Sequence, residues 1–492
     1  MMRMRMQAVT FAIAGSIAAT AFGGGPDVEG IAAYALPAYT LVSANPSAAQ
    51  AATRAAAKAD AILAKLVERA AAGRNGPTFV VMVPNPIWFR YLAPGSGVMG
   101  QFVSAPFANY IQVSVDGGGI EQRVMHEYAH LFLHTQFSGL VPLWFDEGVA
   151  QFVAAATFNG QTATVGEIAR WPRSWPYMGG WWSMTPMGWM PMATLLGLDG
   201  NSRIYRDTLR SYTVHRQGWV MVHRGMAADP AQFGKQMYAL LDAQNDFVPP
   251  EIAIRNSFGM SPGEFDLLIH SYSEGPFVTR DLAIGPIPFP ELPAARHVPA
   301  LESLELIAEM MMASGYRANR FGELIDAMDR AAPGSPVARA LRMRLAARHR
   351  SGTALDQLVK GLDAGADPRL LRGAGLALFE RALAAQPDAR PDKALGLLDL
   401  ATTSRPDDAE AVWAYATLAA GLKRDLSLAR IRIEAMRTSW PANADLAMAA
   451  AQVYEALGEN EKAHEALQDT RRLAKRPEMI RWANQKLAMA RQ

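Results

Sequence analysis

The first third of the chain reads as short apolar runs combined with two helical patterns. Residues 38–44 (AYTLVSA) predict a short strand, and the β-branched run at 78–84 (TFVVMVP) predicts a central strand. Residues 100–115 (GQFVSAPFANYIQVSV) predict two strands around a turn. The alanine-rich stretch 47–72 favours a helix, and 120–137 predicts a helix of about five turns. This order of elements predicts a mixed α/β layer.

Residues 140–290 predict mostly helices, with one segment that does not fit a regular helix. Between 171 and 192 the chain holds five of its eleven tryptophans, together with four prolines. One interpretation is an aromatic rim on a cleft. The other is a long loop that folds onto its own apolar side chains.

Five prolines between 284 and 300 predict a stiff linker, and we place a domain boundary at 285–300. The residues beyond it, 301–492, are almost wholly helical in pattern. A proline recurs at intervals of 35, 38, 35 and 36 residues, at Pro333, Pro368, Pro406, Pro441 and Pro477.

A period near 34 residues with paired helices is typical of tetratricopeptide repeats. The clearest unit is 441–470, where Tyr454, Gly458, Ala463 and Leu467 occupy the positions of an aromatic, a turn glycine, a small contact residue and an apolar residue. The alternative is a generic helical bundle in which the proline spacing is a coincidence. We therefore predict an α+β domain at 30–284, followed by an all-α, tetratricopeptide-like solenoid.

Composition narrows the classes of protein. The length of 492 residues suits two or three domains, and half of the residues are hydrophobic, which indicates packed cores. The formal net charge is +2 without a long basic run, so nothing points to nucleic acid. The chain has no cysteine, which excludes disulfides, thiolate metal sites and cysteine nucleophiles. A metal could be held only by histidine and carboxylate groups.

The N-terminus predicts export. Arg3 and Arg5 precede an apolar run with small residues, and Ala19-Thr20-Ala21 fits a cleavage site, so that residues 1–21 read as a signal peptide. An uncleaved membrane anchor is the alternative, but the run is short for a span, which needs about 20 apolar residues. A periplasmic or secreted location follows, with no transmembrane segment after cleavage.

The stretch HEYAHLFLH at 126–134 carries the candidate chemistry. His126 and His130 are four residues apart, so they lie on one face of a helix, about 6 Å apart along its axis. That spacing lets two imidazoles bind one zinc ion, and Glu127 beside them is placed to take a proton from a water on the metal. His134 lies about 12 Å beyond His126 along the axis, which is too far to share the ion.

The third ligand is expected in the segment 142–152 (PLWFDEGVAQF). Glu147 follows His130 by 17 residues, which leaves room for a turn and a returning helix. Asp146 is the rival ligand. Neighbouring positions of a helix point about 100° apart, so only one of the two acids should reach the metal.

These residues resemble the gluzincin metallopeptidases, and among them the bacterial peptidase-MA-like domains. The likeness rests on His-Glu-x-x-His at 126–130 followed by Trp-Phe-x-Glu-Gly-x-Ala at 144–150. It implies a zincin-like fold, one Zn²⁺ held by His126, His130 and Glu147, and Glu127 as the general base. The spacing to Glu147 is two or three residues shorter than in thermolysin-like members.

The resemblance extends to both sides of the motif. Residues 109–115 (NYIQVSV) match the edge strand that precedes the active-site helix, to which a peptide could add as a strand. Downstream, 215–223 resembles a helix whose first residue is a tyrosine that stabilises the tetrahedral intermediate. Here that position is His215, which can donate a hydrogen bond to an oxyanion, and Tyr212 is the alternative donor.

Three hypotheses follow. The first is an exported zinc metallopeptidase that hydrolyses peptide or protein substrates, with helical repeats that contact a protein partner. The second is a scaffold in which the repeats bind a partner and the zinc domain is weak or silent. The third is a chance motif in a protein that binds no metal.

Overall fold

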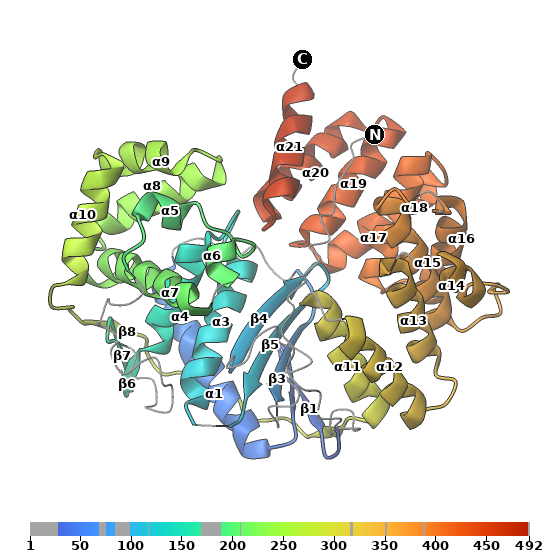
Figure 1. Cartoon of the computed structure of the whole chain (residues 1–492), viewed down its shortest axis with the longest axis horizontal. Helices are drawn as coiled ribbons and strands as arrows, with labels where there is room; N and C mark the ends of the chain where they lie inside the picture. Colours follow the sequence, from blue (N-terminus) through green and yellow to red (C-terminus); the bar gives the residue numbers. More distant parts are fainter. Residues whose placement is uncertain are drawn as a thin grey trace.

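In the computed structural model, the described residues are 28–67, 75–83, 99–116, 118–168, 188–206, 208–314, 318–349, 352–386 and 389–490. The predicted signal peptide and most of the tryptophan-rich segment lie outside these ranges. Within them the chain has an N-terminal mixed sheet followed by a mostly helical remainder, in agreement with the predicted α+β class (Figure 1). No helix in this part of the chain combines the length and apolar character needed to span a membrane.

A six-stranded sheet occupies the centre of the molecule, with the strand order β4-β5-β3-β2-β1-β9. Strands β2, β3 and β5 are parallel, whereas β4 and β1 run antiparallel to their neighbours. The strands are β1 (Ala32–Ala35), β2 (Thr40–Ser43), β3 (Thr78–Val83), β4 (Gly100–Ala105), β5 (Ala108–Ser114) and β9 (Arg296–His297).

This order corrects one prediction from the sequence. Residues 109–115, expected at the edge of the sheet, form β5, which pairs with β3 on one side and β4 on the other. The edge strand is β4. At the other edge lies β9, so the predicted linker 285–300 contributes a short strand to the sheet rather than only connecting two parts.

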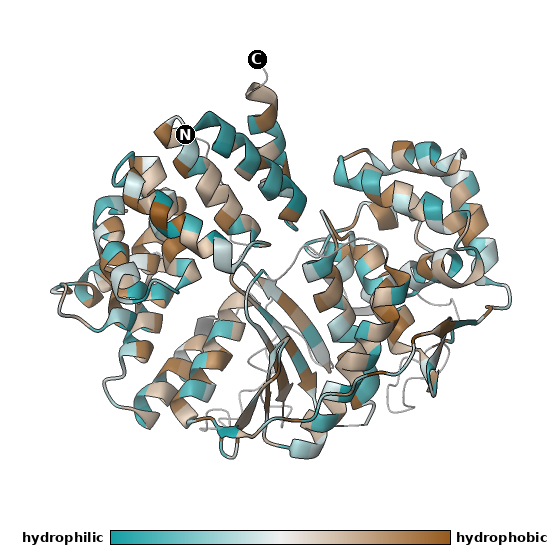
Figure 2. Cartoon of the chain, turned by 180° about the vertical axis from the view of Figure 1, so that it is seen from behind, coloured by the Kyte–Doolittle hydropathy of each residue, from teal (hydrophilic) through white to brown (hydrophobic). Residues whose placement is uncertain are grey.

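Helices cover both faces of the sheet. In β3, Val80 and Met82 face α1 (Pro46–Leu66) and α3 (Ile120–Gln136), while Val81 and Val83 pack in a second cluster with α11 (Ala300–Ala313) and α12 (Ala318–Ala331). Burial on both faces explains why this strand is apolar at nearly every position. The apolar strands between the two helical layers are visible in Figure 2.

Beyond the sheet, the chain forms a helical half that contains a small second sheet, β6-β7-β8, which the sequence analysis did not predict. Its elements, in chain order, are α4 (Leu143–Ala154), β6 (Thr157–Asn159), β7 (Thr162–Val165), α5 (Met192–Leu196), α6 (Arg203–Arg206), α7 (Thr208–His223), the π-helix η1 (Arg224–Ala228), α8 (Phe233–Asn245), α9 (Pro250–Phe258), α10 (Pro262–Ser273) and β8 (Arg280–Ala283).

After α12 the chain continues as helices that stack in an arc (Figure 1). We call α11–α21 the helical array. Its remaining helices are α13 (Pro336–Arg348), α14 (Gly352–Leu358), α15 (Pro368–Leu383), α16 (Pro391–Ser404), α17 (Ala409–Leu422), α18 (Leu426–Ser439), α19 (Ala444–Leu457), α20 (Asn460–Leu473) and α21 (Pro477–Met489).

The repeating prolines mark the starts of successive pairs. Pro368 and Pro477 begin α15 and α21, and Gly458 ends α19 with a φ of 75°, as a turn glycine should. Ion pairs join helices of neighbouring pairs about one period apart, as in Arg432–Asp399 at 2.7 Å and Arg437–Asp469 at 2.7 Å. The array is therefore periodic in its contacts as well as in its sequence.

Candidate metal centre

Helix α3 presents the His-Glu-x-x-His motif at the centre of the molecule. Gly118 and Gly119 adopt φ values of 72° and 69°, which turn the chain from β5 into the helix. Arg123 secures this turn, because its Nη2 donates to the carbonyl of Asp116 at 2.8 Å. His126 and Glu127 are buried on the inner side of the helix.

Helix α4 brings the predicted third ligand to the two histidines. The Nε2 atoms of His126 and His130 are 3.2 Å apart. Glu147 Oε2 lies 3.6 Å from His126 Nε2 and 3.7 Å from His130 Nε2. Ligands about 2.0–2.1 Å from a tetrahedral zinc ion stand about 3.3–3.4 Å from one another. The three atoms therefore form a triangle of the size that such an ion requires.

The approach of α4 to α7 depends on two glycines. A Cβ built on Gly148 would lie 2.5 Å from the carbonyl oxygen of Gly218, and one on Gly218 would collide with the backbone of Trp144. Only glycine at both positions allows the two helices this close. The contact fixes Glu147, which precedes Gly148, opposite the α7 turn that carries His215.

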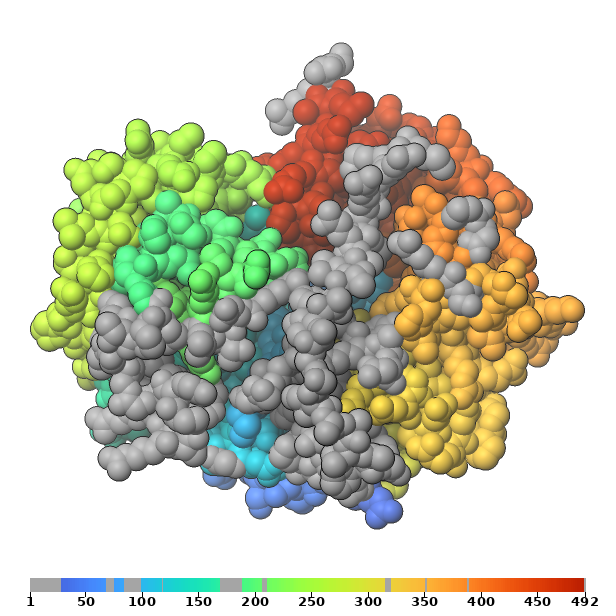
Figure 3. All heavy atoms as spheres, in the orientation of Figure 1, coloured from blue at the N-terminus to red at the C-terminus, as the bar shows by residue number. Residues whose placement is uncertain are grey.

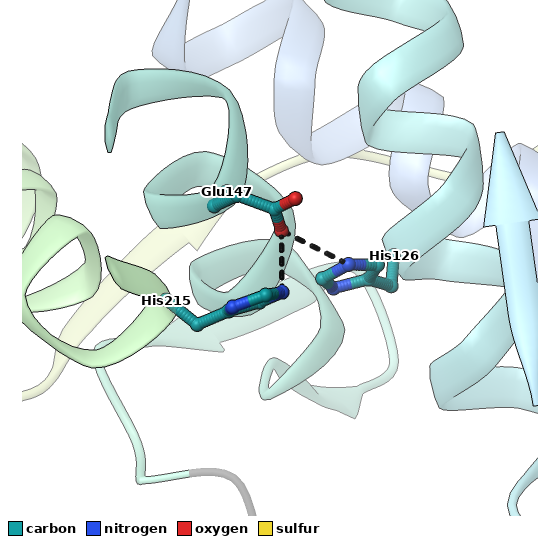
Figure 4. Close-up of side chains that lie close together, drawn as sticks. All are labelled: His126, Glu147 and His215. Atoms are coloured by element: carbon teal, nitrogen blue, oxygen red, sulfur yellow. Dashed lines mark ion pairs between the residues drawn. The ribbon is translucent and has the colours of Figure 1, made fainter. Parts of the chain in front are cut away.

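His215 lies next to the predicted ligands. Its Nε2 is 2.9 Å from Glu147 Oε2, and its ring is nearly parallel to that of His126, as Figure 4 shows. His126, Glu147 and His215 each offer one ligand atom, and these atoms lie within 4.8 Å of one another. His215 is thus placed either to act on a substrate or to join the ligands.

Tyr205 also contacts the cluster, although no sequence pattern marked it as a site residue. Its hydroxyl donates to Glu147 Oε1 at 2.5 Å, and its ring stacks at 6.1 Å on that of His215. Tyr205 belongs to the short helix α6, which lacks a periodic pattern that would place it. Tyr205 thus contacts the cluster through Glu147 and His215, and Tyr212, the predicted alternative donor, lies one turn before His215 on α7.

Asp146, the rival third ligand, contacts the outer sides of two histidines. His130 Nδ1 donates to Asp146 Oδ1 at 2.7 Å, and His134 Nε2 lies 3.0 Å from Asp146 Oδ2. A carboxylate on the Nδ1 of a ligating histidine fixes the ring and raises its basicity. Asp146 and His134 thus orient His130, and His134 stays out of the triangle as predicted.

The hydrogen bonds of the rings leave side-chain atoms that could hold a metal ion. Because His130 Nδ1–H donates to Asp146 and His215 Nδ1–H donates to the carbonyl of Ser211 at 2.6 Å, their Nε2 atoms are free to present lone pairs. Glu147 Oε2 is buried and accepts no hydrogen bond of normal geometry. Several electron-rich atoms converge on one point, and a divalent metal ion would compensate them.

Glu127 is buried beside the triangle, against the edge strand. A Cβ on Gly100 of β4 would lie 2.6 Å from Glu127 Oε1, so the strand passes this carboxylate closely and a side chain at this position would displace it. Burial raises the pKa of Glu127 to about 8. A carboxylate with a pKa near neutrality is suited to accept and return a proton.

The other residues of the α7 motif have packing roles. Gln217 holds the described end of the tryptophan-rich segment, because its Nε2 donates to the carbonyl of Met190 at 2.7 Å. Trp219 is fully buried. From the same segment, Trp189 Nε1 donates to Asp266 Oδ1 at 2.9 Å and packs against α10.

In comparisons with known proteins, no family model, no curated protein and no solved structure matches this chain.

Proposed function

We propose that this chain is an exported zinc-dependent metallopeptidase, with a zincin-like domain at 30–284 and tetratricopeptide-like repeats at 301–492. The observation that carries the proposal is the buried triangle of His126, His130 and Glu147, with separations of 3.2–3.7 Å. Glu127 completes the set, because a site that serves only structure needs no buried base beside it.

Zinc, when bound, would polarise a peptide carbonyl and lower the pKa of a water molecule toward 7. Among the residues of the chain, Glu127 accepts the proton of the attacking water and returns it to the leaving amine. Its pKa of about 8 keeps proton transfer in both directions accessible near neutral pH. Burial also protects this carboxylate from bulk water.

His215 lies beside Glu147 and can donate from Nε2 when both of its ring nitrogens carry a proton. Although burial opposes it, the charge of Glu147 raises the pKa of His215 and so favours that form. A hydrogen-bond donor aimed at the developing oxyanion stabilises the transition state more than it stabilises the bound substrate. His215 occupies the position at which gluzincin metallopeptidases, the family that this sequence resembles, carry a tyrosine. The hydroxyl of Tyr205 donates to Glu147 Oε1 and so orients this candidate ligand.

The substrate proposed is a peptide in extended conformation. Strand β4 is the edge of the sheet and passes directly beside Glu127 at Gly100. An extended peptide can pair with such an edge through its backbone, largely independently of its sequence. Support for export comes from the signal-peptide pattern at 1–21, which implies a periplasmic or secreted enzyme.

The decisive experiment combines elemental analysis with a protease assay. Purified protein should contain about one zinc per chain and cleave casein. Glu127→Gln should keep the zinc and lose cleavage. Glu121→Gln, on the same helix and paired with Lys58, is the matched control and should cleave normally. Undiminished cleavage by Glu127→Gln, or a protein without metal, contradicts the proposal.

A second candidate function is a protein-binding scaffold with a silent zinc domain. The observation in its favour is His215: if its Nε2 joins His126, His130 and Glu147, four protein ligands close the site and leave no position for water. Cobalt-substituted protein separates the two. An open site changes its visible spectrum when a hydroxamate is added, and a closed site does not.

A further inference from the structure

The helical array contacts two elements that lead to the candidate site, and the first contact is at the hairpin turn between β4 and β5. The turn residue Phe107 packs its ring 5.4 Å from that of Trp413 on α17, which in turn contacts Phe379 on α15 at 5.0 Å. A turn of the sheet is therefore held on the inner side of the array by aromatic side chains.

Asn443 binds this turn through its amide. Its Nδ2 donates to the carbonyls of Asn75 at 2.7 Å and Pro106 at 2.6 Å. At the same time its Oδ1 accepts from the backbone N–H of Leu446 and caps α19. The side chain is 2% exposed. Each polar atom of this buried amide thus has a partner, which is the arrangement of a specific contact.

Strand β4 connects the turn to the site. At its far end Gly100 touches Glu127, with the close approach described above. In between, the ring of Phe102 stacks on that of His130 at 6.2 Å and contacts that of His134 at 5.2 Å. A shift of the turn would therefore be transmitted along about five residues of strand to the candidate base and one candidate ligand.

The second contact is at the C-terminal end of α3. Lys475 Nζ donates to the carbonyl oxygens of Phe137 and, at 2.8 Å, Gly139, which caps the helix that carries the motif. The backbone N–H of Gly139 donates to the carbonyl of Arg472 at 2.9 Å. Next to this contact, Arg471 pairs with Asp246 at 2.9 Å. Figure 3 shows the red C-terminal helices lying against this green half of the molecule.

We propose that the helical array is an internal clamp for the candidate site. Asn443 and Trp413 hold the turn at the end of β4, and Lys475 holds the end of α3, so that the strand and the helix that flank Glu127 keep a fixed separation. Asn443 and Lys475 are positioning residues. The role in catalysis rests on the proposed peptidase function, whereas the effect on β4 does not.

In this proposal, the inner surface of the array near α17 and α19 is already occupied. Repeat arrays of this kind often bind an extended or hairpin segment on their inner side. Here the segment is the protein's own β4–β5 turn. A partner would have to compete with it, and such competition would loosen β4.

The test is Asn443→Asp in the full-length protein. The carboxylate can still accept the N–H of Leu446, so the cap is kept, but it cannot donate to Asn75 and Pro106. Asn45→Asp is the matched control, because Asn45 is an exposed cap that accepts from Ala48 at the start of α1. Two readouts are needed: hydrogen exchange of the peptide covering 99–105, and KM and kcat for a peptide substrate.

Exchange of the β4 amides should rise about tenfold in Asn443→Asp, and KM should rise by a similar factor, because a buried hydrogen-bond partner is lost. The Asn45→Asp control should change neither. A purely structural contact would instead lower the active fraction, and so kcat, while KM stays constant. Unchanged exchange in β4 with unchanged KM overturns the clamp.

Two further variants keep the test decisive. If Asn443→Asp does not fold, Trp413→Leu should give the same rise in β4 exchange. Lys475→Met keeps an unbranched aliphatic stem but removes the ammonium group. It should raise the amide hydrogen exchange of residues 137–142. If the wild-type protein cleaves no peptide, the peptidase proposal fails, yet β4 exchange still decides whether the clamp exists.

Discussion

At the scale of single residues, hydrogen bonds on the far side of each ring decide what the histidines of the cluster can do. Nδ1–H of His130 donates a hydrogen bond to Asp146, and Nδ1–H of His215 donates to the carbonyl of Ser211, so both Nε2 atoms turn toward Glu147. The spacing of His126 and His130 predicted two members of the triangle, whereas the choice of Glu147 over Asp146 came from the resemblance to the gluzincins. The structure distinguishes them by their contacts.

His215 gives the first prediction. If it is an oxyanion donor, His215→Phe should retain zinc and lose about 10²–10³ in kcat. His215→Tyr should recover most of that loss, since a phenol can donate the same hydrogen bond. Zinc content is measured by elemental analysis and kcat by peptide cleavage. Loss of zinc from His215→Phe would instead identify His215 as a ligand.

His223 gives a prediction about pH. It is fully buried at the end of α7, where its Nδ1 accepts from the Tyr272 hydroxyl and its Nε2 donates to the carbonyl of Val278. Burial lowers its pKa to about 4. The folded state therefore disfavours the protonated ring, so its contribution to stability is complete above pH 6.5 and is lost as pH falls toward 4.

The size of this effect is about 3 kcal/mol by pH 4. Chemical unfolding of the wild-type protein at pH 7.5, 5.5 and 4.5 should show that the free energy of unfolding falls steeply as the pH decreases. His223→Gln should reduce that slope, while the exposed control His297→Gln should not. Equal slopes in wild type and His223→Gln would contradict the assignment.

At the scale of elements, the sequence patterns located most strands and helices but not their neighbours. The run 79–83 is apolar throughout, and this correctly indicated an interior strand. The hydrophobic patterns of β4 and β5 are similar. Which of the two strands forms the edge of the sheet depends on strand pairing, which the local pattern does not reveal. Tyr205 and the short strands β6–β8 were missed because elements of three or four residues carry too little pattern.

The contact of α4 with α7 gives a prediction at this scale. Gly148→Ala places a methyl group 2.5 Å from the carbonyl of Gly218, so the helices must separate. We expect a loss of about 1–3 kcal/mol in the free energy of unfolding and weaker zinc binding, because Glu147 moves with α4.

The matched control is Gly396→Ala on α16, where nothing lies within 4 Å of the added carbon. It should be neutral or stabilise by up to about 1 kcal/mol, since alanine is the better helix former. Urea denaturation measures both variants. A Gly148→Ala protein as stable as the wild type would show that the helices tolerate the methyl group.

At the scale of the whole molecule, the two faces of the central sheet are covered by helices from different parts of the chain. One face packs on α1 and α3, and the other on α11 and α12, the first two helices of the array. The domain boundary predicted at 285–300 therefore separates two patterns of sequence but does not separate two cores. The array begins as a layer of the N-terminal domain and ends as a clamp on its site.

This sharing of a core predicts how truncated chains behave. A chain of residues 28–299 lacks α11 and α12, and leaves Val81, Val83 and Val103 of the sheet uncovered. An apolar sheet face of this kind promotes aggregation, so this chain should be insoluble or unfold without cooperativity.

A chain of residues 28–332 keeps both helices and should fold cooperatively. It lacks Asn443 and Lys475, so its β4 amides should exchange faster than in the full-length protein. Solubility, circular dichroism melting and hydrogen exchange test the pair, and a cooperative, soluble 28–299 chain would show that the sheet does not need the array.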